Sequence, residues 1–241
     1  MLTIVTYLWG DKYTPEYVER LAAGVARHLK QPHKFFCITE RERDVIFSPG
    51  IERHAIKDPV LIGRSCFVRL RLFDPGWQQN RGITRLVCMD LDSVVVGELD
   101  PLFDRAEDFV ILQGVNSSNP CPYNCSIFML AAGAHSEIWT DFAKLSSHWD
   151  DLGGLIPHHE FPDDQGWLWH KIPRAAAWTP EHNGVYAMHK PGWPKGDNLP
   201  NNARLVVFPG HRDPSQFVKL NWVADNWHKN YPCTPVTPEA A

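Results

Sequence analysis

Two acidic residues, Asp90 and Asp92, follow an apolar run and are separated by one leucine. Alternate side chains of an extended chain point to the same face, so the two carboxylates share a face. They repel each other unless a cation or hydrogen-bond donors neutralise them. Mg²⁺ and Mn²⁺ prefer oxygen ligands and usually keep positions for water and for ligand phosphates. The pair therefore predicts a divalent-cation site for a phosphate-containing ligand, while the alternative is a solvated turn after a strand.

The elements that must position this pair alternate between strands and helices. Apolar and β-branched runs predict strands at residues 2–7, 33–39, 83–89, 109–113, 127–130 and 205–208. A helix start at Thr14-Pro15 and apolar residues at helical spacing predict helices after residue 14 and at 65–73 and 134–145. This alternation predicts an α/β domain with a largely parallel sheet. Ligands bind beyond the carboxyl ends of strands in such sheets, where Thr6, Tyr7 and Asp90 are expected.

The composition is that of an ordinary globular protein. The chain has 241 residues, a hydrophobic fraction of 44% and a formal net charge of -4. This charge argues against a nucleic-acid binder, and six unevenly spaced cysteines do not suggest a disulfide framework. The absence of Walker A, GxSxG and GxGxxG motifs argues against NTPase, hydrolase and dinucleotide-binding functions. We see no signal peptide and no transmembrane run, and therefore expect a cytoplasmic protein.

Four segments in a fixed order resemble a known enzyme family. Residues 88–103 combine an apolar strand, Asp-x-Asp, a second apolar strand, and then Asp-Pro-Leu-Phe. Residues 123–130 begin Tyr-Asn-Cys-Ser, residues 163–166 read Asp-Asp-Gln-Gly, and residues 207–214 read Val-Phe-Pro-Gly-His-Arg-Asp-Pro. Together these segments resemble the GT-A-fold, nucleotide-sugar-dependent glycosyltransferases, and most of all their family-8-like group. The resemblance implies a GT-A-like (Rossmann-like) fold with a mixed, mostly parallel sheet flanked by helices in a single domain.

The resemblance also implies roles for individual residues. Asp90 would contact the nucleotide ribose and the metal, and Asp92 would bind the metal directly. Thr6 and Tyr7 would hold the base, Tyr13 would stack on uracil, and Arg69 would face the nucleotide or donor. The donor sugar and the reacting centre would be faced by Asn124, Asp164 and Gln165. An inverting enzyme would also need a base near the acceptor, for which Asp163, Asp164, His158, His159 and Glu160 are candidates, whereas the resemblance favours retention.

The late loop departs from the family pattern. Val207 stands where the family has a histidine as third metal ligand, and His211 in the same loop is our candidate substitute. Asp213 stands where the family has a lysine near the diphosphate, which makes Arg212 the nearest available cation.

These features lead us to expect metal-dependent transfer of a sugar from a nucleotide sugar, with UDP-sugar as the first candidate. The cofactor would be Mn²⁺ or Mg²⁺, and the acceptor a carbohydrate or another hydroxyl-bearing molecule. One alternative is a sugar nucleotidyltransferase, although the loop at residues 8–13 lacks the Gly-rich basic sequence usual there. Another is a catalytically weak nucleotide-sugar-binding module. We expect one domain at residues 1–230, with a nucleotide and metal half (1–113), a sugar and acceptor half (114–230), and a flexible tail (231–241).

Overall fold

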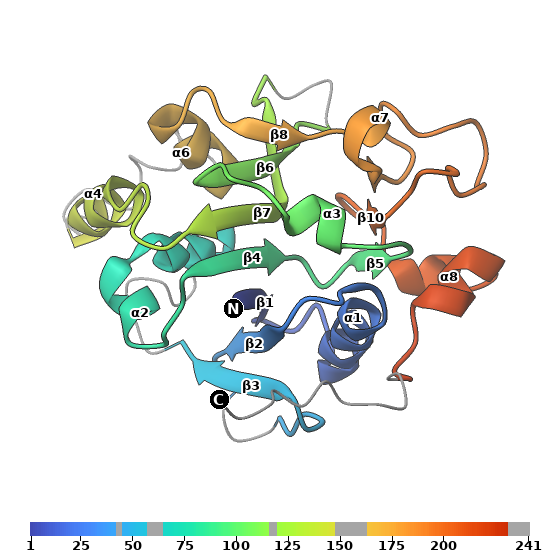
Figure 1. The fold of residues 1–241 in the computed structure, drawn as a ribbon, viewed down its shortest axis with the longest axis horizontal. Coiled ribbons are helices and arrows are strands. Elements are labelled where there is room, and N and C mark those ends of the chain that lie inside the picture. The colour runs from blue at the N-terminus through green and yellow to red at the C-terminus, as the bar shows by residue number, and fades with distance from the viewer. Residues whose placement is uncertain (42–44, 57–64, 116–119, 148–162, 231–241) are drawn as a thin grey trace.

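The computed structural model describes residues 1–41, 45–56, 65–115, 120–147 and 163–230. Its centre is a seven-stranded sheet in the order β3-β2-β1-β4-β7-β6-β8 (Figure 1). The strands are β1 (Leu2–Leu8), β2 (His33–Thr39), β3 (Ile51–Ala55), β4 (Arg85–Met89), β6 (Phe109–Gln113), β7 (Tyr123–Ala131) and β8 (Ala176–Trp178). Only β7 runs antiparallel to its neighbours, β4 and β6. The mostly parallel α/β sheet expected from the sequence is confirmed.

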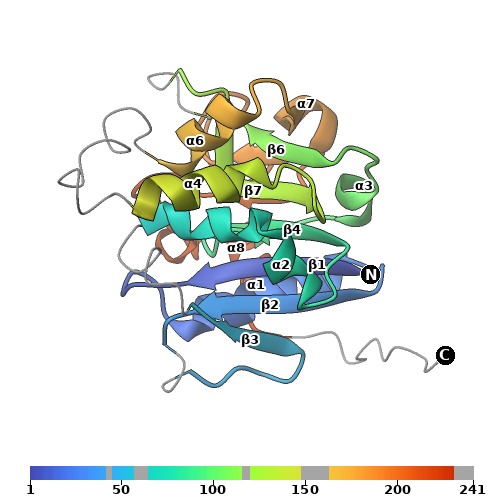
Figure 2. The same ribbon diagram turned by 90° about the vertical axis from the view of Figure 1, so that its left-hand side faces the viewer.

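Both faces of this sheet are covered, which explains why its central strands are apolar runs rather than alternating sequences. One face packs against α1 (Pro15–His28), which contributes Val18, Leu21 and Val25 to the core. The other face packs against the 3₁₀ helix η1 (Ser65–Phe73) and the helices α2 (Pro75–Gln79), α4 (Glu137–Ser147) and α6 (Asp164–Lys171). Figure 2 shows α4 and α6 on the side of the sheet opposite α1.

A second, smaller sheet extends the molecule beyond β4. It contains β5 (Ser93–Val95), β10 (Leu205–Val207) and β9 (Val185–Ala187) in that order. The surrounding short elements are α3 (Asp100–Phe103), α7 (Pro180–Asn183), η2 (Pro214–Phe217) and α8 (Asn221–Asn226). Phe208, Val223 and Trp227 join this sheet in a third apolar cluster, so the late part of the chain has a core of its own beside the main sheet.

The last described helix is attached to the first one. The guanidinium of Arg20 on α1 lies 4.0 Å above the ring of Trp227 and donates to the Trp227 carbonyl over 2.9 Å. Arg27, about two turns further along α1, donates to the Asn226 carbonyl. The amino-terminal helix is therefore held by residues about two hundred positions later in the chain.

Most of the predicted elements are present with shifted bounds. The strands at 33–39 and 109–113 match the prediction, whereas β7 starts four residues before the predicted 127 and the segment 65–73 is a 3₁₀ helix. Within the described ranges, no helix combines the length and the apolar character needed to cross a membrane. The predicted tail at 231–241 lies outside the described residues.

Candidate active site

The sheet order brings two loops together at one edge. β1 has β2 on one side and β4 on the other, and all three strands are parallel. Such a switch in strand order leaves a crevice beyond the carboxyl ends of the strands. The loop after β1 carries Lys12 and Tyr13, and the loop after β4 carries Asp90 and Asp92. Because β7 is antiparallel, its beginning lies at this same edge, and the Asp90 amide donates to the Ser126 carbonyl over 2.9 Å.

Asp92 is buried beneath the first of these loops, with 8% of its surface exposed. The hydroxyl of Tyr13 donates to Asp92 Oδ2 over 2.7 Å, and the ammonium of Lys12 lies 3.7 Å from the same oxygen. Burial and the neighbouring Asp90 carboxylate raise the pKa of Asp92 to about 7, against the opposing effect of Tyr13 and Lys12. These surroundings therefore favour the neutral form of the Asp92 carboxyl group more than water does. A bound cation would favour the ionised form.

Arg69 joins two carboxylates that lie on different elements. Its Nη2 is 2.9 Å from Asp90 Oδ1, and its Nη1 is 3.0 Å from Asp164 Oδ2. The same Nη1 donates to the Cys125 carbonyl at the start of β7. Asp164 is 2% exposed, and burial raises its pKa while Arg69 lowers it. A planar guanidinium suits such a bridge, because its donors point in two directions at fixed angles.

The first turn of α6 completes this edge of the site. Asp163 is the N-cap of α6 and accepts a hydrogen bond from the Gly166 amide. Gln165 donates to Asp163 and accepts from the Cys125 amide, so its side chain links α6 to β7. Asn124 accepts from the Ser126 amide. The segments 123–130 and 163–166 are thus neighbours in space, as their shared assignment to the site requires.

Other predicted residues bond within the protein or lie on the loop after β10, where the Phe208 amide donates to the Asp92 carbonyl over 3.0 Å. The Thr6 hydroxyl donates to the Met89 carbonyl, and the Tyr7 hydroxyl donates to the Val68 carbonyl, so both hydroxyls bond within the protein. His211 is exposed and Arg212 is half-buried on the loop after β10. Among the described residues, no three His, Cys, Asp or Glu side chains form a group that could hold a metal ion. The alternative bases His158, His159 and Glu160 lie outside the described residues.

Asp90 and Asp92 nevertheless suit a cation that completes its coordination with other ligands. The contacts within the described residues reach only one oxygen of each carboxylate, Oδ1 of Asp90 and Oδ2 of Asp92. Mg²⁺ and Mn²⁺ commonly use one or two protein carboxylates together with water and phosphate oxygens. The pair therefore fits such an ion without a third protein ligand.

Sequence reasoning missed Lys12 and the partner of Asp213. Lys12 has only its position beside Tyr13 to distinguish it from other lysines. Asp213 accepts a hydrogen bond from the Tyr17 hydroxyl over 2.8 Å and caps η2 through the Ser215 amide. The Tyr17 ring is also 4.9 Å from the Tyr13 ring, so Asp213 supports the site through Tyr17.

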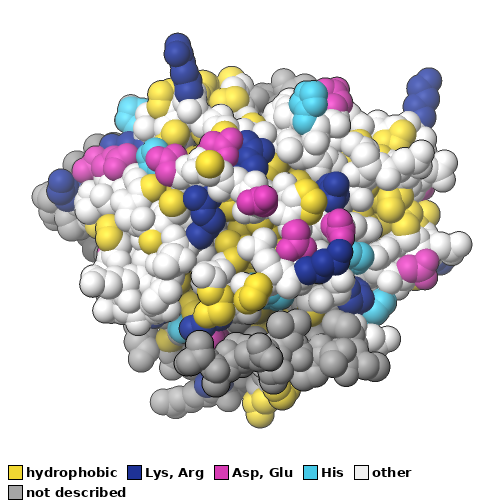
Figure 3. Space-filling model, in the orientation of Figure 1, with side chains coloured by type: hydrophobic (Ala, Val, Ile, Leu, Met, Phe, Trp, Pro, Cys, Tyr) yellow, Lys and Arg dark blue, Asp and Glu magenta, His cyan; other side chains and the backbone are white. Residues whose placement is uncertain are grey.

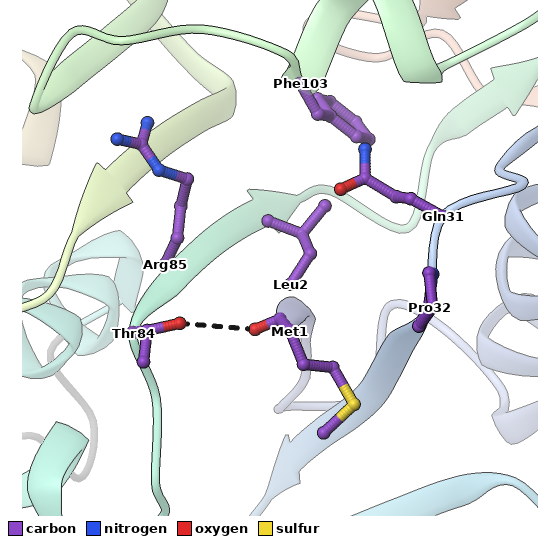
Figure 4. A pocket seen from close by; sticks show the side chains of 7 residues that line it. All are labelled: Met1, Leu2, Gln31, Pro32, Thr84, Arg85 and Phe103. Carbon is purple, nitrogen blue, oxygen red and sulfur yellow. Dashed lines mark hydrogen bonds between the residues drawn. The ribbon is translucent and has the colours of Figure 1, made fainter. Parts of the chain in front are cut away.

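A cavity lies at the edge of the sheet opposite the candidate site. This cavity of about 500 Å³ is found where β1, β2 and β4 begin, and the Thr84 hydroxyl donates to the Met1 carbonyl beside it (Figure 4). Its lining residues are Met1, Leu2, Gln31, Pro32, Thr84, Arg85 and Phe103. Because Leu2 and Arg85 start their strands, the cavity is a strand length away from Asp90.

Acidic and basic side chains lie close together across the face shown in Figure 3.

Comparison with known proteins supports the fold and goes no further. No protein-family model matches the chain, and no curated protein matches it in sequence. Among solved structures, it resembles that of an active-site mutant of LgtC, a family-8 glycosyltransferase, in which a glutamine is replaced by glutamate. The TM-score is 0.65 and the sequence identity is 12%, with 96% of this chain and 98% of that chain covered. The GT-A-like fold is thereby confirmed, while membership of family 8 stays a prediction.

Proposed function

We propose that the protein transfers a sugar from a nucleotide sugar to a hydroxyl-bearing acceptor, with UDP-sugar as the first candidate donor. The observation that carries the proposal is the meeting of Asp90 and Asp92 with Tyr13, Arg69 and Asp164 at the strand-order switch. A fold shared with a glycosyltransferase supports it further. Ligand sites in open α/β sheets concentrate at such a switch, which supports this edge over the opposite one.

The charges at this edge favour a divalent cation as part of the function. Asp90, Asp92 and Asp164 carry three negative charges when ionised, and Arg69 and Lys12 supply two positive charges. A bound diphosphate would add further negative charge and repel the carboxylates. We therefore propose that Asp90 and Asp92 hold Mn²⁺ or Mg²⁺. Such an ion supplies positive charge where the leaving diphosphate becomes more negative.

The remaining side chains would bind and orient the donor. In this proposal Tyr13 supports the base, and the strand end at Thr6 and Tyr7 fixes the loop that carries it. Arg212 provides positive charge from the late loop, with His211 beside it as a further metal ligand in the loaded protein. Arg69 keeps Asp90 and Asp164 in place on either side of its guanidinium.

Asn124, Asp163, Asp164 and Gln165 would face the donor sugar. Gln165 is held between Asp163 and the Cys125 amide. A carboxamide held by two hydrogen bonds keeps its position while the bond from the anomeric carbon to the diphosphate breaks. The oxocarbenium-like transition state is stabilised most by polar groups that are already in place.

A nucleotide-sugar-binding protein with little or no transfer activity is the second candidate. The observation that favours it is the lack, among the described residues, of a third metal-binding side chain near Asp90 and Asp92. Binding without turnover separates this candidate from the first.

The deciding experiment follows nucleoside diphosphate release from a panel of nucleotide sugars with Mn²⁺. We expect release from one donor, lost on chelation and in Asp92→Ala, but retained in Asp104→Ala, which removes an exposed carboxylate elsewhere. Metal-dependent nucleotide binding by calorimetry without release would favour the binding protein. If the protein neither releases nucleoside diphosphate nor binds nucleotide, both candidates are overturned.

A further inference from the structure

Lys12 lies on the solvent side of the buried Asp92 carboxylate. Its side chain is 57% exposed, and its ammonium is 3.7 Å from Asp92 Oδ2. The same ammonium lies 4.6 Å from the centre of the Tyr13 ring, so the aromatic face guides it toward Asp92. A ligand that approaches Asp92 from solvent therefore meets Lys12 first.

Arg69, another cation at this edge, is less able to move than Lys12. Arg69 is shared between Asp90, Asp164 and the Cys125 carbonyl, and its side chain is only 16% exposed. Turning it toward a ligand would leave two carboxylates without their partner, which is strongly unfavourable for buried charges. Lys12 has one weak, partly solvated ion pair and a flexible stem with three donors, so it changes partners at little cost.

A divalent ion and the Lys12 ammonium would therefore compete for the Asp92 carboxylate. Among the described residues, Lys12 supplies the ammonium that forms an ion pair with Asp92. A divalent ion on Asp90 and Asp92 would repel it, because like charges a few ångström apart are unfavourable. The ammonium released in this way would remain within reach of any phosphate oxygen bound to the same ion.

We propose that Lys12 is a diphosphate-binding residue that exchanges Asp92 for the donor's diphosphate when the metal binds. This inference rests on the proposed function and adds a cation from the β1–α1 loop to Arg212 of the late loop. It predicts two effects of opposite sign from one substitution. Removing Lys12 strengthens binding of the metal alone, and weakens binding of a nucleoside diphosphate with the metal.

The test is calorimetry on the full chain with three probes: MnCl₂ alone, UDP with Mn²⁺, and uridine with Mn²⁺. In Lys12→Ala we expect Mn²⁺ alone to bind about 2- to 5-fold more tightly, since a solvated ion pair is lost. We expect UDP to bind about 10-fold more weakly, since a charge-assisted hydrogen bond is lost, and uridine affinity to stay within about 2-fold. Lys12→Arg should retain most of the UDP affinity.

Lys30 offers a matched control at the opposite end of α1. It is also an exposed lysine paired with a carboxylate, that of Glu98. Lys30→Ala should change none of the three affinities. Equal UDP affinity in Lys12→Ala and the original protein would overturn the inference alone. An equal loss for uridine and UDP would also overturn it, because it would indicate a damaged base site. No UDP binding by the original protein would overturn the proposed function and this inference with it.

Discussion

Asp92 is the residue at which burial and charge conflict most directly. Its carboxyl group is almost completely removed from solvent, and a second carboxylate lies two residues away. A tyrosine hydroxyl and a lysine ammonium offset this only in part, so the pKa remains raised. A structural residue in such a place would be replaced by an amide at a gain in stability. A carboxylate at this position suits a residue that binds a cation during function.

The raised pKa of Asp92 predicts that the metal-free protein loses stability as the pH rises. In the unfolded chain this carboxyl ionises near 3.8, and in the folded protein near about 7. The proton therefore stabilises the folded state fully below about pH 4, and this contribution, up to about 4 kcal/mol, is lost as the pH rises through 7. Urea unfolding at a series of pH values measures it.

Asp92→Asn isolates this contribution from the other titrating groups. The difference in unfolding free energy between the two proteins should move in favour of the variant between pH 4 and pH 7. Mn²⁺ should restore stability to the original protein at pH 8 and leave the variant unchanged. A difference that is constant with pH would show that Asp92 ionises normally in the folded state.

At the scale of elements, the smaller sheet consists of three-residue strands that depend on close backbone approach. Gly184 ends α7 with a φ of 69° and leads directly into β9. A Cβ at this position would lie 2.0 Å from the Asn202 carbonyl oxygen. The Gly184 carbonyl accepts from the Arg204 amide, which precedes β10. The pairing of β9 with β10 thus requires a residue without a side chain.

Gly184→Ala should destabilise the protein by about 3 kcal/mol or more, because a left-handed backbone and a steric clash add together. Gly82→Ala is the matched control: its φ is 62°, but nothing lies within 4 Å of the added Cβ. The control should lose only about 1–2 kcal/mol. Urea denaturation followed by circular dichroism measures both. Equal losses would mean that the loop around Asn202 moves aside easily.

Long elements were predictable from the sequence, whereas several short ones were not. The strand at 33–39 and the helix that starts at Pro15 show their own periodicity and punctuation. Strands β8 and β9 have three residues each, too few to show a pattern, and exist because a neighbouring strand is already in place. The sequence pattern therefore predicts neither β8 nor β9.

The same contrast applies to the site. Asp90 and Asp92 are separated by one residue, so their spacing alone predicts a shared face. The ion pair between Arg69 and Asp164 joins residues 95 positions apart, and only the packing of η1 against α6 selects it. The bond between Tyr17 and Asp213 spans 196 positions and is invisible for the same reason. Sequence reasoning names the acids, while tertiary structure chooses their partners.

At the scale of the whole molecule, Trp227 connects the end of the described chain to the candidate site. Its ring lies 5.0 Å from that of Tyr17, which in turn lies 4.9 Å from that of Tyr13. Only 5% of Trp227 is exposed, and its buried indole N–H has no acceptor within the described residues. The ring therefore contributes by packing and by its contact with Arg20 rather than by hydrogen bonding.

Trp227→Ala should destabilise the protein by about 3–5 kcal/mol, because a large buried ring is replaced by a cavity. Trp227→Phe should lose much less, about 1 kcal/mol, since it keeps a ring under Arg20 and removes the unpaired N–H. Urea midpoints of the two variants provide the comparison. A phenylalanine variant as unstable as the alanine variant would indicate that the N–H has an acceptor.

Helix α1 makes contacts with a segment that is synthesised much later. Arg20 and its partner at Trp227 are 207 residues apart. At about 20 residues per second, the fastest ordinary rate of synthesis, roughly ten seconds separate their appearance. Throughout that interval α1 lacks its outer support, and the loop with Tyr13 lacks the aromatic contacts behind it. Helix α1 is therefore made about two hundred residues before the segment that completes its contacts.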